Sequence, residues 1–369
     1  MSTRTAAGAK TLPGRYYTSE TVYRRESERI FGEKWLYAGR AGRITAPGDY
    51  FLFENGNENL IILRNRRGQI RAFHNLCRHR GTRLCKAPEG RFSSSIQCPY
   101  HAWTYRLDGE LSGAPNMHEV EGFAKSDYPL LPAACAEWEG GIFVNFGENP
   151  EPFTEAYAAV HGKFSIWHLP ELEVAHRIEY TVRANWKLIM QNYSECYHCP
   201  SLHPALNRLT PYRNSSNDLE AGLILGGPMH LARPGGSMTM SGLTCAPPLG
   251  EITGEALNSI YYYVFFPNFL LSLHPDYVLT HRLDRLAADR TRVICEWLFH
   301  PDAMARPEFD PSGAIEFWNM TNRQDWEVCE LSQQGVESRA YRPGPYAELE
   351  SMIAAFDRTY LETLGELQG

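Results

Sequence analysis

The sequence predicts an α+β protein of two domains, one rich in short strands and one that combines an antiparallel sheet with helices. Short β-rich runs bounded by Gly, Asn and Pro occupy residues 38–149. From about residue 151, helical stretches mix with longer strands, and the 369 residues suffice for two separate cores. We expect a helical segment at 1–37 that packs on the second domain, a β-rich domain at 38–150 and the second domain at 151–369.

The N-terminal segment has the pattern of an amphipathic helix. Its apolar positions within residues 19–36 recur with helical spacing, and the expected core contacts are Tyr23, Ile30, Phe31 and Trp35. The runs FLFEN, LIILRN and IFVNF that follow have the length and composition of strands. They predict the first, β-rich domain.

The second domain begins beyond the turn residues at 148–150. Three successive β-rich runs, SIYYYVFFPNFLLSLH, DYVLTHRLDRL and TRVICEWLFHP, predict an antiparallel sheet, and the last sixty residues are mainly helical in pattern. Aromatic residues alternate through the first run, so we expect them in the core: Tyr261, Tyr262, Tyr263, Phe265 and Phe266.

Composition argues against several classes of protein. A net charge of −7 without a basic tract gives little support for nucleic-acid binding. The nine cysteines are odd in number and scattered, so a disulfide framework is not expected. The first residues lack the apolar core of a secretory signal, and the most apolar run, 261–273, is interrupted by Pro267 and Asn268. We expect a cytoplasmic protein that does not bind membranes.

Two short motifs supply a first set of metal ligands. Cys77-Arg-His79 and Cys98-Pro-Tyr-His101 are separated by eighteen residues. Two thiolates and two imidazoles could hold tetrahedral zinc in a small structural knuckle. They could equally hold a Rieske [2Fe–2S] cluster, in which two Cys bind one iron and two His the other. Gly81 can adopt the positive φ that a tight cluster loop requires.

The residues around these ligands favour the iron–sulfur alternative. CRHRG followed by CPYHAWTY resembles the Rieske domain of ring-hydroxylating and related Rieske oxygenases, whose pattern is C-x-H-R-G and then C-x-x-H-x-W-x-Y. Every ligand position of that pattern is present. The resemblance extends over nearly the whole chain and implies that the second domain is a helix-covered antiparallel sheet with catalytic function.

A second metal site is indicated in NWKLIMQNYSECYHCPSLHP, residues 185–204. His198 and His203 would lie roughly 140° apart on one continuous helix. Pro200 breaks such a helix, so the two imidazoles can converge in a facial triad for Fe(II). Either histidine alone could be a hydrogen-bonded structural residue. The segment resembles the catalytic segment of the Rieske oxygenases, which implies that both are ligands of a mononuclear iron.

The third ligand should be a carboxylate from residues 313–338. The candidates in this segment are Glu316, Asp325, Glu327 and Glu330. On a helix, Asp325 shares a small and polar face with Trp318, Thr321, Asn322, Cys329 and Ser332, whereas Glu327 lies about 200° away. QDWEVCE also resembles the late Asp motif of the family, so we choose Asp325; a solvated helix face is the alternative.

Glu195 precedes His198 by three residues, hence on the same face of a helix. The resemblance implies that a carboxylate here links the mononuclear-site histidine to a cluster histidine, His101, of the neighbouring subunit in a homotrimer. Most ring-hydroxylating members have Asp four residues after the Asn, whereas here Glu195 follows Asn192 by three. We place both residues in the catalytic set. Cys196 and Cys199 are expected to be small packing residues.

The ECYHC string resembles the branch that acts on quaternary ammonium compounds, such as carnitine and glycine betaine monooxygenases. The resemblance implies a separate flavin-containing reductase that supplies electrons from NAD(P)H, O₂ as co-substrate, and oxidative N-demethylation of a small molecule. Aromatic-ring hydroxylation or O-demethylation on the same machinery is the alternative activity. An electron carrier or iron–sulfur sensor with a degenerate second domain is the alternative class. An ammonium group would need an aromatic cage, and the sequence assigns no residue to it.

Overall fold

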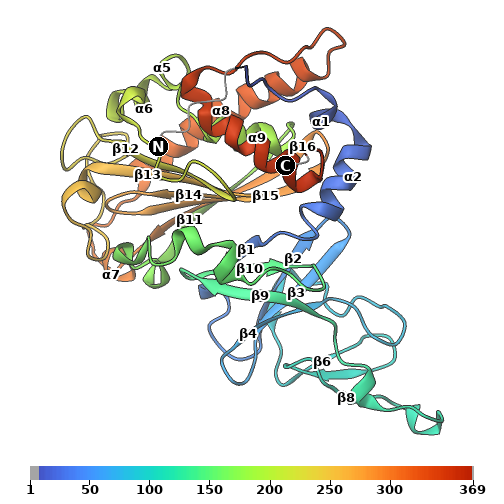
Figure 1. Ribbon diagram of the computed structural model, residues 1–369. Helices are drawn as coiled ribbons and strands as arrows, with labels where there is room; N and C mark the ends of the chain where they lie inside the picture. The colour runs from blue at the N-terminus through green and yellow to red at the C-terminus, as the bar shows by residue number, and fades with distance from the viewer. Residues whose placement is uncertain (1–7, 368–369) are drawn as a thin grey trace. The chain divides into compact units, whose positions relative to one another are not determined.

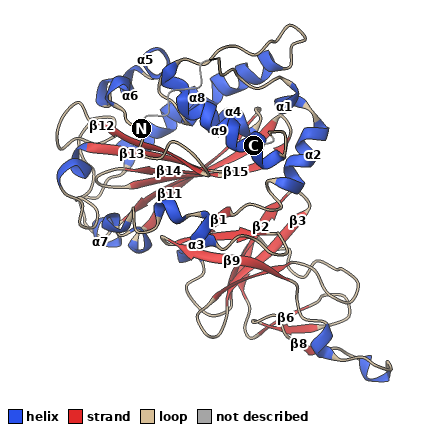
Figure 2. Cartoon of the chain, in the orientation of Figure 1, coloured by secondary structure: helices blue, strands red, loops and turns tan. Residues whose placement is uncertain are grey.

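The computed structural model describes residues 8–367. Its contacts divide the chain into two compact units, one formed by Phe31–Pro150 and the other by the chain up to Ile30 together with Glu151 onward. The limits expected from the sequence were 37 and 150, and the limits of the units are Ile30 and Pro150. Antiparallel sheets in both units and helices in the larger one confirm the α+β class (Figures 1 and 2).

The Phe31–Pro150 unit is a β domain. Its larger sheet has the order β1-β10-β9-β4-β3-β2-β5 and its smaller sheet the order β6-β7-β8, with antiparallel pairs throughout. The strands are β1 (Leu36–Arg40), β2 (Asp49–Asn55), β3 (Glu58–Arg64), β4 (Ile70–His74), β5 (Glu89–Arg91), β6 (Ser95–Gln97), β7 (Thr104–Arg106), β8 (Leu111–Gly113), β9 (Pro132–Trp138) and β10 (Gly141–Asn145). The predicted runs FLFEN, LIILRN and IFVNF fall on β2, β3 and β10.

The other unit is built on a six-stranded antiparallel sheet of order β11-β16-β15-β14-β13-β12. Its strands are β11 (Glu173–Val182), β12 (Ile224–His230), β13 (Ser259–Phe265), β14 (Phe269–Leu273), β15 (Val278–Ala287) and β16 (Arg290–Phe299). The three predicted β-rich runs form β13 to β16, which are consecutive neighbours in the sheet. Short connections of this kind favour antiparallel pairing.

Helices α4, α8 and α9 lie together on one side of this sheet (Figure 2). The helices are α1 (Arg15–Thr18), α2 (Glu20–Arg29), α3 (Phe153–Ala156), α4 (Trp186–Tyr193), α5 (Cys199–Leu202), α6 (Pro204–Leu209), α7 (Pro301–Met304), α8 (Ser312–Val336) and α9 (Ser351–Leu364). Among residues 8–367, no helix combines the length and the apolar character needed to cross a membrane.

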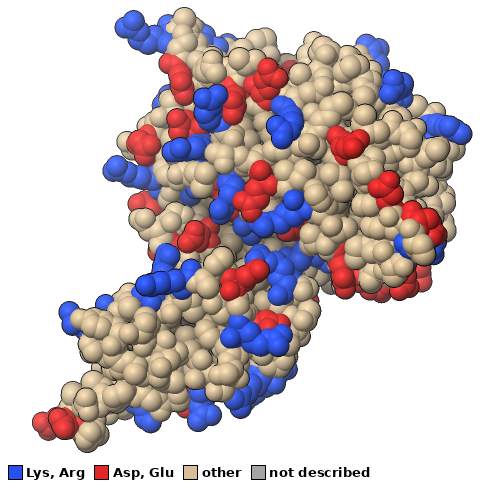
Figure 3. Space-filling view, turned by 180° about the vertical axis from the view of Figure 1, so that it is seen from behind, with Lys and Arg blue, Asp and Glu red and all other residues tan. Residues whose placement is uncertain are grey.

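The N-terminal helix is shorter than predicted. It ends at Arg29, and residues up to Trp35 form turns before β1, although Ile30, Phe31 and Trp35 are buried as expected. Both signs of charge occur on each unit over the face shown in Figure 3, and neither forms a continuous stripe there.

Candidate metal centres

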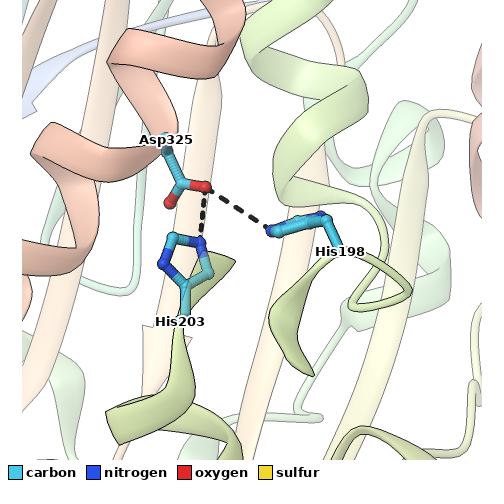
Figure 4. A group of neighbouring side chains, drawn as sticks. All are labelled: His198, His203 and Asp325. Atoms are coloured by element: carbon cyan, nitrogen blue, oxygen red, sulfur yellow. Dashed lines mark hydrogen bonds and ion pairs between the residues drawn. The ribbon is translucent and has the colours of Figure 1, made fainter. Parts of the chain in front are cut away.

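His198, His203 and Asp325 converge on one point (Figure 4). Asp325 Oδ1 lies 2.8 Å from His203 Nε2 and 3.5 Å from His198 Nε2. One potential ligand atom from each residue lies within 4.8 Å of the other two. Two imidazole nitrogens and one carboxylate oxygen on one side of a point form the facial donor set that suits Fe(II) with open positions for other ligands.

The local chain path differs from the expected one. Helix α4 ends at Tyr193, before His198, and Pro200 lies in the first turn of the short helix α5. Proline is well tolerated there because the first N–H groups of a helix have no internal partner. His198 and His203 are therefore the residues that flank α5 on either side, and their ring centroids lie 5.1 Å apart.

Each imidazole has a second partner that orients it. His198 Nδ1 lies 2.6 Å from Glu195 Oε1, and His203 Nδ1 lies 2.7 Å from Gln324 Oε1. With Nδ1 held this way, Nε2 of each ring is directed toward Asp325. The sequence analysis did not identify Gln324 as a partner of His203, although Gln324 is next to Asp325 in the sequence.

The ionisation of His198 and that of Asp325 depend on each other. Burial favours the neutral imidazole of His198, but the carboxylates of Asp325 and Glu195 outweigh burial and raise the pKa of His198 to about 10. Burial likewise opposes ionisation of Asp325, yet hydrogen bonds from His198 and His203 lower its pKa below the usual value. A divalent cation requires the charged carboxylate and two neutral imidazoles, so its binding takes the place of the proton on His198.

The other acidic candidates lie elsewhere. Glu316 and Glu327 are exposed on α8, and Glu330 accepts hydrogen bonds from the backbone N–H and guanidinium of Arg183. Asp325 is thus the candidate that the fold brings to the histidines.

Glu195 is not on a helix with His198, contrary to the expectation, because residues 194–198 form a turn after α4. Its carboxylate nevertheless reaches the His198 ring, and its Oε2 accepts from the backbone N–H groups of Tyr197 and His198. Glu195 thereby stabilises the turn at residues 194–198 and orients the His198 ring. Asn192, on α4, contributes to the adjacent cavity.

Cys196 and Cys199 are joined in a disulfide, which corrects the expectation that they are separate packing residues. Sequence reasoning placed both on a continuous helix. Their Cα atoms lie 5.0 Å apart, within the range that a disulfide can bridge. The remaining seven cysteines are free thiols.

A cavity opens beside the three converging residues. It is lined by Glu195, His198, His203 and Asp325, by the aromatic residues Tyr193, Tyr262 and Trp318, by the apolar residues Leu206, Leu225, Met229, Val264, Leu349 and Met352, and by smaller or polar residues that include Asn192, Thr321, Ser215, Ser216 and Asn217. Tyr262 was expected in the core; Tyr263, Phe265 and Phe266 are buried there as predicted.

The three aromatic side chains form one wall of this cavity. Tyr262 contacts Tyr193 and Trp318 with ring centroids 6.0 and 6.1 Å apart. The Tyr193 hydroxyl lies 2.7 Å from that of Ser272, the Trp318 indole N–H donates to Tyr277, and the Tyr262 hydroxyl is buried. The polar atoms are thus directed elsewhere, and the wall consists of ring surface.

In the β domain, the first motif pair lies on two adjacent loops. Cys77 and Cys98 are buried free thiols, whereas His79 and His101 are exposed, with ring centroids 4.8 Å apart. The Tyr105 hydroxyl lies 3.3 Å from Cys77 Sγ. Buried sulfurs and outward imidazoles suit a cluster whose histidine-bound iron faces solvent.

The loops themselves are held by backbone hydrogen bonds. The Gly81 N–H donates to the Cys77 carbonyl, and the Ala102 N–H donates to the Cys98 carbonyl. Gly81 has φ of 71°, which confirms its predicted positive value. Trp103 stacks on the His79 ring at 4.9 Å with an interplanar angle of 7°, so the aromatic residue of the second motif supports a ligand of the first.

Family models match both units. Residues 34–124 match the Rieske [2Fe-2S] domain, and residues 169–366 match the ring hydroxylating alpha subunit catalytic domain. The first match selects the iron–sulfur cluster over zinc.

Relatives agree with these matches. The glycine betaine monooxygenase oxygenase subunit of Chromohalobacter salexigens is 32% identical over 98% of this chain and 87% of its own length. The carnitine monooxygenase oxygenase subunit of Escherichia coli is 33% identical over 54% of each chain. A crystal structure of a quaternary ammonium Rieske monooxygenase in complex with L-carnitine is 25% identical and superimposes with a TM-score of 0.78 over 96% of both chains.

The structure and the family matches indicate the same two metal sites. The buried thiols and outward imidazoles lie within the Rieske match, and the centre of His198, His203 and Asp325 lies within the catalytic-domain match. The chain belongs to the Rieske non-haem iron oxygenases, as an α subunit of monooxygenase type whose cofactors are a Rieske [2Fe–2S] cluster and a mononuclear iron.

Proposed function

We propose that this protein is the oxygenase component of a quaternary ammonium monooxygenase, which hydroxylates an N-methyl or adjacent C–H bond of a betaine-like substrate. The observation that carries the proposal is the wall of Tyr193, Tyr262 and Trp318 beside the His198, His203 and Asp325 centre. A quaternary ammonium accepts no directional hydrogen bond, and aromatic ring surface is its preferred environment. Relatives named for glycine betaine and carnitine support this substrate class.

Each metal centre has its own residues in the proposal. Cys77, His79, Cys98 and His101 would hold the [2Fe–2S] cluster, and the second set, His198, His203 and Asp325, would hold Fe(II). When bound, these groups supply O₂ activation with electrons from NAD(P)H through a separate flavin-containing reductase.

The residues around the centre position the imidazoles and the substrate. Glu195 and Gln324 fix the two imidazoles, and the aromatic wall orients the ammonium so that a methyl group faces the centre. The net reaction consumes the N-methyl compound, O₂, NAD(P)H and one proton, and yields water, NAD(P)⁺ and a carbinolamine. The carbinolamine then loses formaldehyde and a proton to leave the tertiary amine.

We further propose a cytoplasmic homotrimer in which Glu195 lies between His198 of one subunit and His101 of the next. A hydrogen-bonded carboxylate can couple two metal-bound imidazoles. The relation to a quaternary ammonium monooxygenase whose structure is described in terms of inter-subunit electron transfer supports this arrangement.

The experiment incubates the purified protein with a reductase, NADH and a panel of quaternary ammonium compounds and aromatic acids. Consumption of NADH is expected to match the release of formaldehyde, after attack at an N-methyl group, or the release of a tertiary amine and an aldehyde through C–N cleavage, after attack at an adjacent C–H bond. Production of cis-diols from aromatic acids without formaldehyde would instead establish ring hydroxylation. Iron analysis separates the enzyme, with about three irons and two acid-labile sulfides per chain, from an electron carrier with about two irons.

A further inference from the structure

The Cys196–Cys199 disulfide ties the turn after α4 to the start of α5. It encloses Tyr197 and His198, so one of the two residues inside the cross-linked loop is an iron ligand. Cys199 Sγ lies 3.9 Å from His198 Nε2, the nitrogen that faces Asp325. The cross-link is therefore adjacent to the mononuclear centre.

The same loop positions Glu195 and His203. The N–H groups of the two enclosed residues both donate to Glu195 Oε2, and the other carboxylate oxygen of Glu195 lies 2.6 Å from His198 Nδ1. The Cys199 carbonyl accepts a hydrogen bond from the His203 N–H at 2.9 Å. A change in the loop therefore reaches both histidine ligands and the carboxylate that orients one of them.

A purely structural role accounts poorly for this disulfide. Its two cysteines are only three positions apart in the sequence. Because a disulfide stabilises a protein largely by restricting the unfolded chain, a loop this short contributes about 2 kcal/mol, less than half of the contribution of a loop of about a hundred residues. The other seven cysteines are free thiols. In a reducing compartment such as the proposed cytoplasm, disulfides are usually catalytic or redox-sensing.

The cavity gives a small thiol reagent access to the disulfide. Cys196 and Cys199 are both among the residues that line it. Cys196 is partly exposed, whereas Cys199 is buried, with 2% of its surface accessible. A dithiol that enters the cavity therefore attacks Cys196, and Cys199 is the leaving sulfur.

We propose that Cys196 and Cys199 form a reversible redox-modification site, and that its reduction by a dithiol weakens the retention of the mononuclear iron. One thiol of the reductant attacks Cys196 Sγ, which breaks the S–S bond and releases Cys199 as a thiol. The second thiol of the reductant then displaces Cys196, so that two electrons and two protons have passed to the protein. A thiol oxidant such as diamide takes them back and restores the disulfide. This site acts on the iron centre and is independent of the substrate class.

The test measures iron release from the wild-type holoenzyme in the absence of O₂. One sample is treated with diamide and the other with dithiothreitol, both reagents are removed, and ferrozine captures the Fe(II) that dissociates. The dithiothreitol-treated form is expected to release its mononuclear iron at least about threefold faster, while the cluster absorbance persists in both forms. A second treatment with diamide should restore the slow release.

Two outcomes would overturn the inference. One is an equal rate of iron release from the two forms. The other is mass spectrometry that finds Cys196 and Cys199 as free thiols after diamide treatment. Both outcomes leave the proposed function standing, because iron release is measured without substrate and without turnover.

A pair of variants locates the effect. The double variant Cys196→Ser with Cys199→Ser has no cross-link, so it is expected to release iron at the faster rate after either treatment. Cys135→Ser, which removes a free thiol from the β domain, should respond as the wild type does. A double variant that still responds to dithiothreitol would assign the effect to another cysteine and contradict the role of this pair.

Discussion

The two imidazoles of the mononuclear centre are each held at Nδ1 by a side-chain oxygen, Glu195 for His198 and Gln324 for His203. This arrangement fixes which nitrogen of each ring faces Asp325 and limits ring rotation. Contacts within the protein therefore orient both imidazoles toward Asp325.

Asp325→Ala is expected to empty the mononuclear centre while the cluster absorbance persists. Two imidazoles without a carboxylate bind Fe(II) weakly, so iron should fall from about three to about two per chain. Metal analysis with visible absorption spectra checks this. Glu327→Ala, an exposed acid on the same helix, is the control; full iron in Asp325→Ala would assign the third ligand to another acid.

Glu195→Gln is expected to retain both centres and lower steady-state turnover by about tenfold to a hundredfold. Glutamine keeps an oxygen for the backbone N–H groups of the turn but removes the charge that faces His198. Glu195→Ala should also leave iron bound but additionally loosens this turn. Rapid reduction of the cluster followed by slow product formation would identify electron transfer from the cluster to the mononuclear iron as the slowed step. Wild-type turnover in both variants would refute the proposed position of Glu195 between His198 and His101.

The Cys196–Cys199 disulfide encloses Tyr197 and His198. The double variant Cys196→Ser with Cys199→Ser is expected to weaken Fe(II) binding by several-fold, because a small cross-linked loop contributes up to about 2 kcal/mol of conformational restraint. Metal titration measures the change, with Cys135→Ser, a free thiol, as control. Alkylation and mass spectrometry verify the pair; equal affinity in the double variant would mean that the cross-link does not restrain His198.

At the scale of elements, one buried ion pair ties the N-terminal helix α2 to α4. Glu26 accepts from Lys187 at 2.5 Å, from the Trp186 indole at 3.0 Å and from the Tyr360 hydroxyl at 2.8 Å. Arg285 lies 3.7 Å from the same carboxylate. Helix α2 is in this way part of the unit that carries the mononuclear centre.

Glu26→Leu is expected to lower the free energy of unfolding by about 3–5 kcal/mol, since Lys187 would remain buried without its carboxylate. Burial already lowers the pKa of Lys187, which shows the cost of its charge in this place. Urea denaturation measures the loss. Glu28→Leu, an exposed position on the same helix, should change stability by less than about 0.5 kcal/mol, and an equal effect of both variants would refute the role of the pair.

At the scale of the whole molecule, the proposed electron route requires two subunits. A mixture of His101→Ala, which disables the cluster, with Asp325→Ala, which disables the mononuclear centre, is expected to regain part of the wild-type turnover after subunit exchange. In mixed trimers some intact clusters lie beside intact mononuclear centres. Turnover assays before and after mixing, with light scattering for the oligomeric state, check this; no recovery in exchanged trimers would place the route within one chain.

The sequence by itself determined the two donor sets and the order of the domains. Cys77 with His79, Cys98 with His101, and His198 with His203 are local pairs, and the motifs around them predict metal ligands through their resemblance to the Rieske oxygenases. Helical periodicity was enough to separate Asp325 from Glu327, because both lie on the same long helix. The four strands after residue 258, β13 to β16, were likewise visible as three β-rich runs.

Only the tertiary structure decided the features that depend on chain turns and on contacts distant in sequence. The end of α4 at Tyr193 replaced the expected helix by a turn, and the chain beyond it carries the Cys196–Cys199 disulfide. The pairing of β12 with β13 brought Tyr262 beneath the segment of Ser216 and Asn217, and α8 added Trp318. Strand register and helix packing set these positions, and neither is encoded in the spacing of residues along the chain.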